Sequence, residues 1–230
     1  MDHAITKGVI DDHNCRLAIK SFYIKPSTPH PTIKQDEIST LFTDLNAAKT
    51  TPQTYLLICF SFLTALRQKE AVNAQWAEFD FKAKLWHIPK ERMKGQADKK
   101  RPHTIPLSRQ ALQILAIMKP LAGDSPFVFV DRDGKSPMNE STVNVALKRN
   151  GYKGRLVAHG IRAFIKTFLA SQKVDRNVSE CVLAHLLAGG DDLENTYNRY
   201  DYLEERKEAM QMIADHLENH GMRIKPLDTV

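Results

Sequence analysis

Four dispersed residues have side chains that could act together on an anionic substrate. Arg67 follows the apolar run LLICFSFLTAL, His159 and Arg162 lie in AHGIRAF, and His185 lies in VLAHLL. Because residues i and i+3 share one face of a helix, His159 and Arg162 can reach one ligand. Taken singly, each residue has an ordinary structural explanation that its local sequence favours. Arg67 could cap a helix or pair with Glu70, and His185 could be a hydrogen-bonded core residue.

These residues become informative when they are combined with a lysine-rich stretch and a tyrosine. Arginine forks match the oxygens of a phosphate, histidine adds a donor, and a mobile lysine can protonate a leaving oxygen. Free tyrosine has a pKa of about 10, so roughly 0.1% is phenolate at pH 7, and a tyrosine nucleophile needs cationic or basic neighbours. The sequence contains no nucleotide-binding loop, HExxH motif or acidic metal cluster. The combined set therefore suits metal-free attack on a phosphodiester.

Three tyrosines lie close together in ENTYNRYDYLEER, namely Tyr197, Tyr200 and Tyr202. A tyrosine in a basic chain can stack on bases, fill a core or attack phosphorus. The local sequence does not distinguish these uses.

The charge of the chain fits a polyanionic partner. Lys and Arg exceed Asp and Glu by 33 to 27, which gives a net charge of +6 and a pI near 9.2. The excess is concentrated in KERMKGQADKKRPH (90–103). Such a stretch predicts salt-dependent binding to phosphates, although a solvated basic surface is equally ordinary. The residues that we expect to bind the polyanion are Arg92, Lys99, Lys100 and Arg101.

Composition indicates a soluble globular protein in a reducing compartment. Hydrophobic residues make up 42% and charged residues 26% of the 230 positions. The longest apolar run has 12 residues, fewer than the roughly 20 needed to cross a membrane. No secretory signal is visible, and three scattered cysteines do not form a disulfide framework. We expect a cytoplasmic protein with no membrane partner.

The pattern of elements predicts a mostly helical α+β domain with a small antiparallel three-stranded sheet. Helical spacing begins at QDEISTLFTDLNAA, and a second helix starts at Thr51-Pro52. WAEFDF, KLWHIP and HTIPL are interpreted as the three strands, with Trp76 and Trp86 in the core. Ser108 is the expected N-cap of the next helix, and FVFV (127–130) is a further extended run.

Helical periodicity continues from Asn139 to the C-terminal part of the chain. It covers ESTVNVALKR, HGIRAFIKTFLASQ and DRNVSECVLAHLL, and a last amphipathic helix is expected at about 203–220. His216 and His220 lie four residues apart on that helix. An exposed polar face is favoured for them over a metal site.

The order of these motifs resembles the tyrosine recombinase family, closest to integrases of prophages and integrative islands. The segments are FLTALRQKEAVNAQWAEFD, RMK, RPHTIPLSRQAL, GYKGRLVAHGIRA, LAH and TYNRYDYLEER, within residues 35 to 217. The resemblance implies the tyrosine recombinase catalytic-domain fold and cleavage through a 3′-phosphotyrosyl intermediate with a free 5′-hydroxyl. It also implies that no metal or nucleotide cofactor is needed. Double-stranded DNA attachment sites and further copies of the chain, as a tetramer on DNA, are the implied partners. Accessory DNA-bending proteins are further candidates, and the implied location is the bacterial nucleoid.

Carried over residue by residue, the resemblance implies a catalytic set and one supporting carboxylate. Glu70 matches the acidic residue that supports the first arginine of the family. Lys94 matches the hairpin lysine that acts as general acid. The implied catalytic set is Arg67, Lys94, His159, Arg162, His185 and the nucleophile Tyr197.

Three features depart from the family pattern. Ala65 stands where relatives usually have glycine, which is expected to shift the turn but to leave the arginine in place. The residues GQAD lengthen the hairpin, so Lys99 or Lys100 could replace Lys94 as the acid. The spacing from His185 to Tyr197, through LLAGGDDLEN, is slightly long. We expect Tyr197 to be the nucleophile, and the two later tyrosines to seat the segment before the last helix.

Three divisions of the chain are expected. Residues 1–34, punctuated by prolines, are interpreted as a linker and remnant of an upstream core-binding domain, 35–220 as the catalytic domain, and 221–230 as a tail. Relatives carry arm-binding and core-binding domains ahead of this one. The chain is therefore expected to be a fragment or natural remnant that binds attachment-site DNA weakly.

Alternative functions stay open at this point. A type IB topoisomerase uses similar residues, and a decayed integrase could bind DNA without turnover. A structural helical domain with an accidental basic loop would require the whole ordered set to be coincidence.

Overall fold

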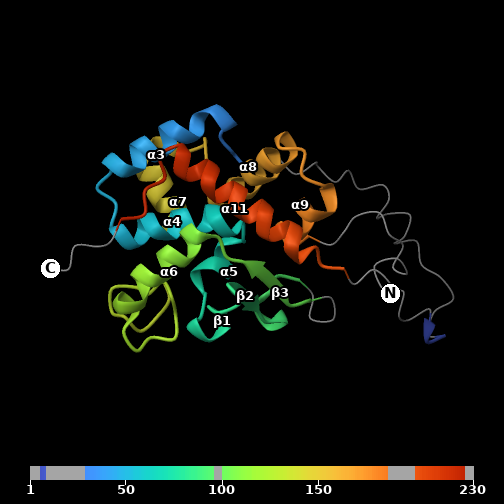
Figure 1. Cartoon of the computed structure of the whole chain (residues 1–230). Coiled ribbons are helices and arrows are strands. Elements are labelled where there is room, and N and C mark those ends of the chain that lie inside the picture. The colour runs from blue at the N-terminus through green and yellow to red at the C-terminus, as the bar shows by residue number, and fades with distance from the viewer. Residues whose placement is uncertain (1–5, 9–28, 96–99, 186–199, 226–230) are drawn as a thin grey trace.

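The computed structural model describes residues 6–8, 29–95, 100–185 and 200–225 (Figure 1). Tyr197 and Lys99 lie outside the described residues. The helices are α3 (Ile38–Ala47), α4 (Pro52–Thr64), α5 (Gln68–Val72), α6 (Arg109–Ala122), α7 (Thr142–Leu147), α8 (Ala158–Ser171), α9 (Arg176–Val182) and α11 (Leu203–Asn219). The strands are β1 (Phe79–Asp80), β2 (Leu85–Ile88) and β3 (His103–Pro106), and shorter helical turns cover Gln35–Glu37, Trp76–Glu78, Lys90–Arg92 and Lys148–Tyr152.

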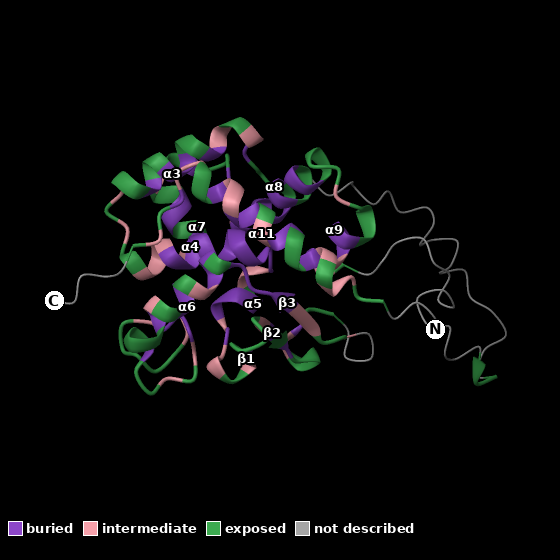
Figure 2. Cartoon of the chain, viewed as in Figure 1, coloured by how far each residue is buried: buried purple, intermediate pink, exposed green. Residues whose placement is uncertain are grey.

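Helix α4 forms the centre of the domain, as its apolar sequence predicts. Thr51 caps its start by accepting a hydrogen bond from the Thr54 backbone N–H, and Pro52 occupies the first turn. Every residue from Leu56 to Thr64 is buried, and helices α6, α7, α8 and α11 pack around it (Figure 2). A helix that is apolar on all sides is stable only when it is surrounded in this way.

The predicted antiparallel sheet is confirmed, with strand order β1-β2-β3. Trp86 of β2 pairs with Ile105 of β3 and is completely buried, with its ring 5.0 Å from that of Phe79. Trp76 is half-buried and packs beside Phe79, so it belongs to the same aromatic cluster. The FVFV segment forms isolated bridges and no strand of this sheet.

The C-terminal part of the fold agrees with the predicted helices, with one correction. Ser108 caps α6 by accepting from the Ala111 backbone N–H, as expected. The expectation of an exposed face for His216 and His220 is wrong. Both rings are half-buried, because His216 stacks on Phe168 and His220 donates from Nδ1 to the His216 carbonyl at 2.7 Å. Within the described ranges, no helix is long and apolar enough to span a bilayer.

Candidate active site

Arg67 is positioned by the sharp turn that joins α4 to α5. Ala65 ends α4 in the left-handed conformation (φ 51°, ψ 21°), which costs a non-glycine residue about 1–2 kcal/mol. Alanine therefore adopts the conformation that glycine favours, and the chain still places Arg67 as the N-cap of α5. The Glu70 carboxylate accepts from the Arg67 backbone N–H at 3.1 Å and from its Nη1 at 3.4 Å.

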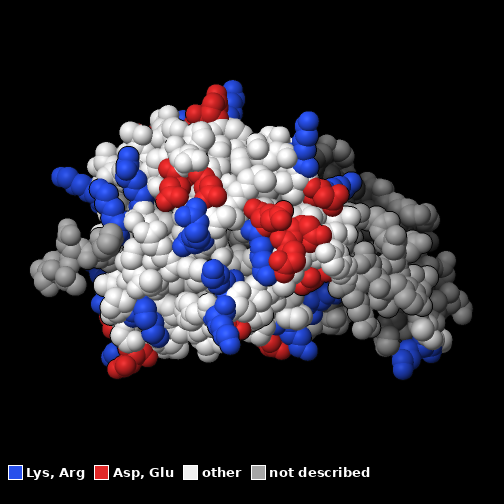
Figure 3. Space-filling view, viewed as in Figure 1, with Lys and Arg blue, Asp and Glu red and all other residues white. Residues whose placement is uncertain are grey.

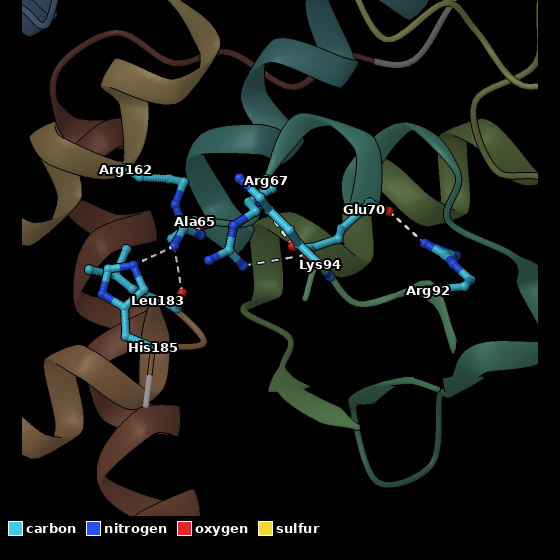
Figure 4. Close-up of polar contacts among 8 residues, drawn as sticks. All are labelled: Ala65, Arg67, Glu70, Arg92, Lys94, Arg162, Leu183 and His185. Carbon is cyan, nitrogen blue, oxygen red and sulfur yellow. Dashed lines mark hydrogen bonds and ion pairs between the residues drawn. The ribbon is translucent and has the colours of Figure 1, made fainter. Parts of the chain in front are cut away.

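Glu70 also connects the turn to the hairpin that carries Lys94. Its side chain is only 2% exposed, and Oε1 lies 3.4 Å from the Lys94 backbone nitrogen, which donates to it. Figure 4 shows Arg67, Glu70 and Lys94 together at the centre of the site. One buried anion thus holds the side chain of one predicted catalytic cation and the backbone of another.

Arg92 belongs to the same hairpin, and its guanidinium is turned inward towards Glu78 and α5. It donates to the Glu78 carboxylate at 2.8 and 2.9 Å, to the Glu70 carbonyl at 2.7 Å and to the Asn73 carbonyl. Glu78 in turn accepts from the Trp86 indole at 2.9 Å. These contacts attach the hairpin to the sheet and to α5, and they occupy donors that the sequence analysis assigned to DNA.

Arg162 of α8 is the most deeply buried cation of the site, at 4% exposure. Nη1 donates to the Ala65 carbonyl at 2.6 Å, and Nη2 donates to the Leu183 carbonyl at 2.6 Å and contacts His185 Nε2 at 2.9 Å. Burial, together with the nearby Arg67, lowers the pKa of Arg162 to about 10. The guanidinium still carries its charge at neutral pH, and its neighbours fix the plane of the fork.

His185 is aimed at Arg162 by the end of α9. Ala184 adopts a left-handed conformation, its N–H donates to the Cys181 carbonyl, and the His185 N–H donates to the Glu180 carbonyl. This pattern is a Schellman motif, which reverses the chain. Because Arg162 can only donate, His185 Nε2 accepts, and Nδ1 carries the proton that is donated to Glu180 at 2.7 Å. Burial lowers the pKa of His185, which favours this neutral tautomer.

Glu180 is a functional candidate that the sequence analysis missed. It is buried, and it accepts from both His185 and Lys166 at 2.7 Å. Burial raises the pKa of Glu180, but the hydrogen bonds from Lys166 and His185 outweigh that effect and lower it overall. The signal in the sequence was an acidic residue five positions before the histidine, on the helix that leads to it.

His159 lies at the start of α8 and is exposed. Burial of part of the ring lowers its pKa, and the positive charges of Arg162, Arg67 and Lys94 lower it further. These three cations come from α8, the start of α5 and the hairpin. Arg162 bonds to the Ala65 carbonyl two residues before Arg67 and contacts His185, and Glu70 links Arg67 to the Lys94 backbone. His159 lies one turn before Arg162, so these predicted residues lie in one part of the fold, and their catalytic roles stay predictions.

The remaining predicted residues lie around this region or outside the described residues. Lys100 donates from Nζ to the Glu91 carbonyl at 3.0 Å, and Arg101 is exposed. Tyr200 donates its hydroxyl to Glu205 at 2.9 Å, and that bond raises its pKa, opposite to the change that activates a nucleophile. Tyr202 takes a left-handed conformation as N-cap of α11, and Asn177 donates to its hydroxyl at 3.4 Å. Tyr200 and Tyr202 therefore make structural contacts at the start of α11.

His103 of β3 is a half-buried titratable group that the sequence analysis did not single out. Its Nε2 is enclosed and finds no hydrogen-bond partner in the part of the chain that the structure describes. Burial, with Arg206, Arg162 and Arg67 nearby, lowers its pKa to about 3. The ring is therefore neutral in the folded protein at any pH near neutrality.

We expect this histidine to make the fold less stable in mild acid. Because the folded-state pKa lies below the unfolded value of about 6.5, the unfolded chain binds the proton more tightly. The neutral ring therefore makes its full contribution to the free energy of unfolding above about pH 6.5. As the pH falls, that free energy decreases, by about 2 kcal/mol at pH 5. Chemical denaturation at pH 7.5 and pH 5 should show a smaller loss for His103→Gln than for the wild type. His87→Gln, at an exposed histidine on the neighbouring strand, is the control, and an unchanged loss in His103→Gln would contradict the assignment.

Comparison with known proteins identifies the family to which this chain belongs. The phage integrase family model matches residues 31–203. The chain is 39% identical to prophage integrase IntA of Escherichia coli K12 over 94% of this chain and 51% of that protein. It is 29% identical to the integrase of Enterobacteria phage P4 over 95% of this chain and 52% of that protein.

Solved structures share the fold at low sequence identity. The Tn1549 transposon integrase in complex with circular intermediate DNA has a TM-score of 0.60 at 13% identity, covering 90% of this chain and 73% of that one. A lambda integrase (75–356) dimer bound to a COC′ core site has a TM-score of 0.56 at 16% identity, covering 87% and 69%. The chain belongs to the phage integrase family and has the catalytic-domain fold of tyrosine recombinases. It spans about half the length of IntA and of the P4 integrase.

Proposed function

We propose that this chain is the catalytic domain of a prophage or genomic-island integrase that cuts and rejoins DNA at attachment sites. The observation that carries the proposal is the proximity of Arg67, Lys94 and Arg162, which printed contacts through Glu70 and Ala65 hold together (Figure 4). His159 lies one turn before Arg162 on α8, and His185 contacts Arg162 directly. This set can hold one phosphodiester. Membership of the integrase family supports the same reaction, and it does not favour the topoisomerase alternative.

The reaction that we propose uses the side chains in distinct roles. The Tyr197 hydroxyl attacks the phosphorus, the bond to the 5′-oxygen breaks, and the tyrosine becomes linked to the 3′-phosphate. Arg67 and Arg162 donate to the non-bridging oxygens, where negative charge accumulates in the transition state. His159, kept neutral by its lowered pKa, is available to accept the phenol proton. Lys94 donates a proton to the departing 5′-oxygen.

Residues around this centre support the catalytic set. Glu180 holds the His185 tautomer, and Glu70 holds Arg67 and the hairpin backbone. Lys99, Lys100 and Arg101 are proposed to contact DNA phosphates, which position the duplex without reading its sequence. Arg92 is proposed to act chiefly by attaching the hairpin to Glu78 and to the Glu70 carbonyl.

The charge distribution suggests which surface faces away from DNA. Acidic side chains gather over the first part of α11 on the face seen in Figure 3, where Glu204 and Glu205 occupy the first turn. A DNA duplex on that surface would bring like charges together. We therefore propose that the exposed side of α11 is turned away from the duplex.

Assembly with further copies on DNA is also part of the proposal. Solved relatives include a lambda integrase dimer bound to a core site and a lambda integrase tetramer bound to a Holliday junction. We propose a comparable tetramer on attachment-site DNA and association with the bacterial nucleoid. Accessory DNA-bending proteins remain candidate partners.

A nicked attachment-site suicide substrate tests the function. Denaturing electrophoresis should show a covalent protein–DNA adduct in the wild type, in Tyr200→Phe and in Tyr202→Phe, but none in Tyr197→Phe. An adduct that persists in Tyr197→Phe would contradict the nucleophile assignment. The assay is repeated at saturating protein, because weak DNA binding by this chain could limit the yield. If no adduct forms at either protein concentration, the result favours the non-catalytic DNA-binding remnant.

A further inference from the structure

The segment just before the first helix of the body is attached to the helix that carries His159 and Arg162. The Pro31 carbonyl accepts from the Val157 N–H at 3.3 Å, and Thr32 Oγ1 donates to the Gly160 carbonyl at 2.8 Å. Gln35 continues the contact one turn later by donating from Nε2 to the Phe164 carbonyl at 2.9 Å. Three hydrogen bonds thus align residues 31–35 with the first two turns of α8.

Gly160 permits this close approach. A Cβ atom at this position would lie 1.9 Å from the Pro31 carbonyl oxygen and 2.9 Å from its carbonyl carbon. These are backbone atoms, so the clash could be relieved only by moving the segment or the helix. The glycine of the HGIR motif is therefore explained by the segment that crosses it.

The same segment places a histidine against a predicted catalytic one. The rings of His30 and His159 lie 4.3 Å apart between centroids, with an interplanar angle of 54°. This is a close, tilted contact of the kind that aromatic rings prefer over a face-to-face sandwich. An exposed side chain such as His159 otherwise samples several rotamers, and a neighbouring ring limits that freedom.

We propose that His30 is a positioning residue of the active site, whose ring packs at a tilt against His159 and holds it in the orientation required for strand cleavage. This inference rests on the proposed function, because it assigns His30 a role in that same reaction. Residues 29–35 then belong to the active site, because they carry His30. The contact spans 129 positions of the sequence, so nothing in the local pattern around either histidine indicates it.

The charged groups that face His159 give the contact a measurable electrostatic consequence. His30 approaches from the segment, Arg162 from α8, Arg67 from the start of α5 and Lys94 from the hairpin. After the burial of the ring, the charge that His30 can carry is the next cause of the lowered pKa of His159. Removal of the His30 imidazole should therefore raise the pKa of His159, whereas a residue with no contact would leave it unchanged.

Two substitutions at His30 separate the ring contact from its charge. We expect His30→Ala to slow strand cleavage about tenfold at saturating DNA without weakening DNA binding, because a loosened reacting group loses rate steeply. His30→Phe keeps a ring on His159 and should restore most of the rate. In both variants the NMR titration of the His159 ring should move to higher pH.

Two further variants complete the test in the full 230-residue chain. Gly160→Ala should displace the segment and reproduce both effects of His30→Ala, although His30 itself is retained. His87→Ala, at an exposed histidine on β2, is the matched control and should change neither the titration nor the rate. An unchanged His159 titration and cleavage rate in His30→Ala would overturn the inference. The titration needs no turnover, so failure of the wild type to form an adduct would count against the proposed function alone.

Discussion

Replacing Arg162 by lysine is expected to slow formation of the covalent adduct by about 10²–10³-fold, the range found when one transition-state donor is removed. The guanidinium makes three contacts within the protein, to the Ala65 carbonyl, the Leu183 carbonyl and His185. These contacts fix the plane of the fork, which a flexible ammonium cannot reproduce. Lysine keeps the positive charge, so the loss measures geometry and not charge alone.

The experiment is a single-turnover cleavage assay on the nicked substrate at saturating protein. Arg155→Lys is the matched control, because that arginine is exposed and pairs with Glu37 at the surface. It should retain the wild-type rate. Chemical denaturation of Arg162→Lys is measured alongside, so that loss of fold is separated from loss of rate. A folded Arg162→Lys variant that cleaves within about threefold of the wild type would contradict the role assigned to the fork.

Much of this site could be predicted because its determinants are local. The apolar run of α4 required a buried helix, and His159 and Arg162 lie one helical turn apart whatever the tertiary structure. The roles of Arg67 and Lys94 come from the resemblance alone and stay predictions. The sequence analysis noted Ala65 at a position where relatives usually have glycine. Only the structure shows that this alanine is left-handed.

Other features depend on contacts between distant segments, and the sequence did not reveal them. Arg92 lies in a basic stretch and therefore suggested a DNA contact, whereas the register of the sheet brings Glu78 beneath it. Glu180 becomes important only because the Schellman turn folds His185 back onto it. The contact of His30 with His159 is of the same kind, since it depends on how residues 29–35 cross α8.

Removing Arg92 is expected to be the most destabilising substitution in the hairpin region. Arg92→Ala should lower the free energy of unfolding by about 3–5 kcal/mol, because loss of one partner leaves a buried charge uncompensated. The side chains of Arg92 and Glu78 are only 15% and 8% exposed, and the Glu70 and Asn73 carbonyls also lose their donor. Chemical denaturation measures the change, and the same variant should lose cleavage activity because Lys94 follows two residues later.

A matched ion pair at the surface provides the control for burial. Arg109 and Asp215 are separated by 2.8 Å, the same distance as Arg92 and Glu78, but their side chains are 71% and 43% exposed. Arg109→Ala should cost less than about 1 kcal/mol, since solvent screens such a pair. Equal losses in Arg92→Ala and Arg109→Ala would show that burial does not determine the effect.

A double substitution tests whether the unpaired carboxylate causes the loss at Arg92. Arg92→Met keeps much of the side-chain volume but strands the Glu78 charge, whereas Arg92→Met combined with Glu78→Gln removes both charges. Glutamine retains an oxygen that can accept from the Trp86 indole, which now donates to Glu78. The double variant should therefore be more stable than Arg92→Met alone, with a coupling energy above about 1 kcal/mol. The losses of stability in Arg92→Met and in Glu78→Gln could instead simply add in the double variant. That result would mean that Arg92 stabilises the hairpin through its bonds to the Glu70 and Asn73 carbonyls and not through the ion pair.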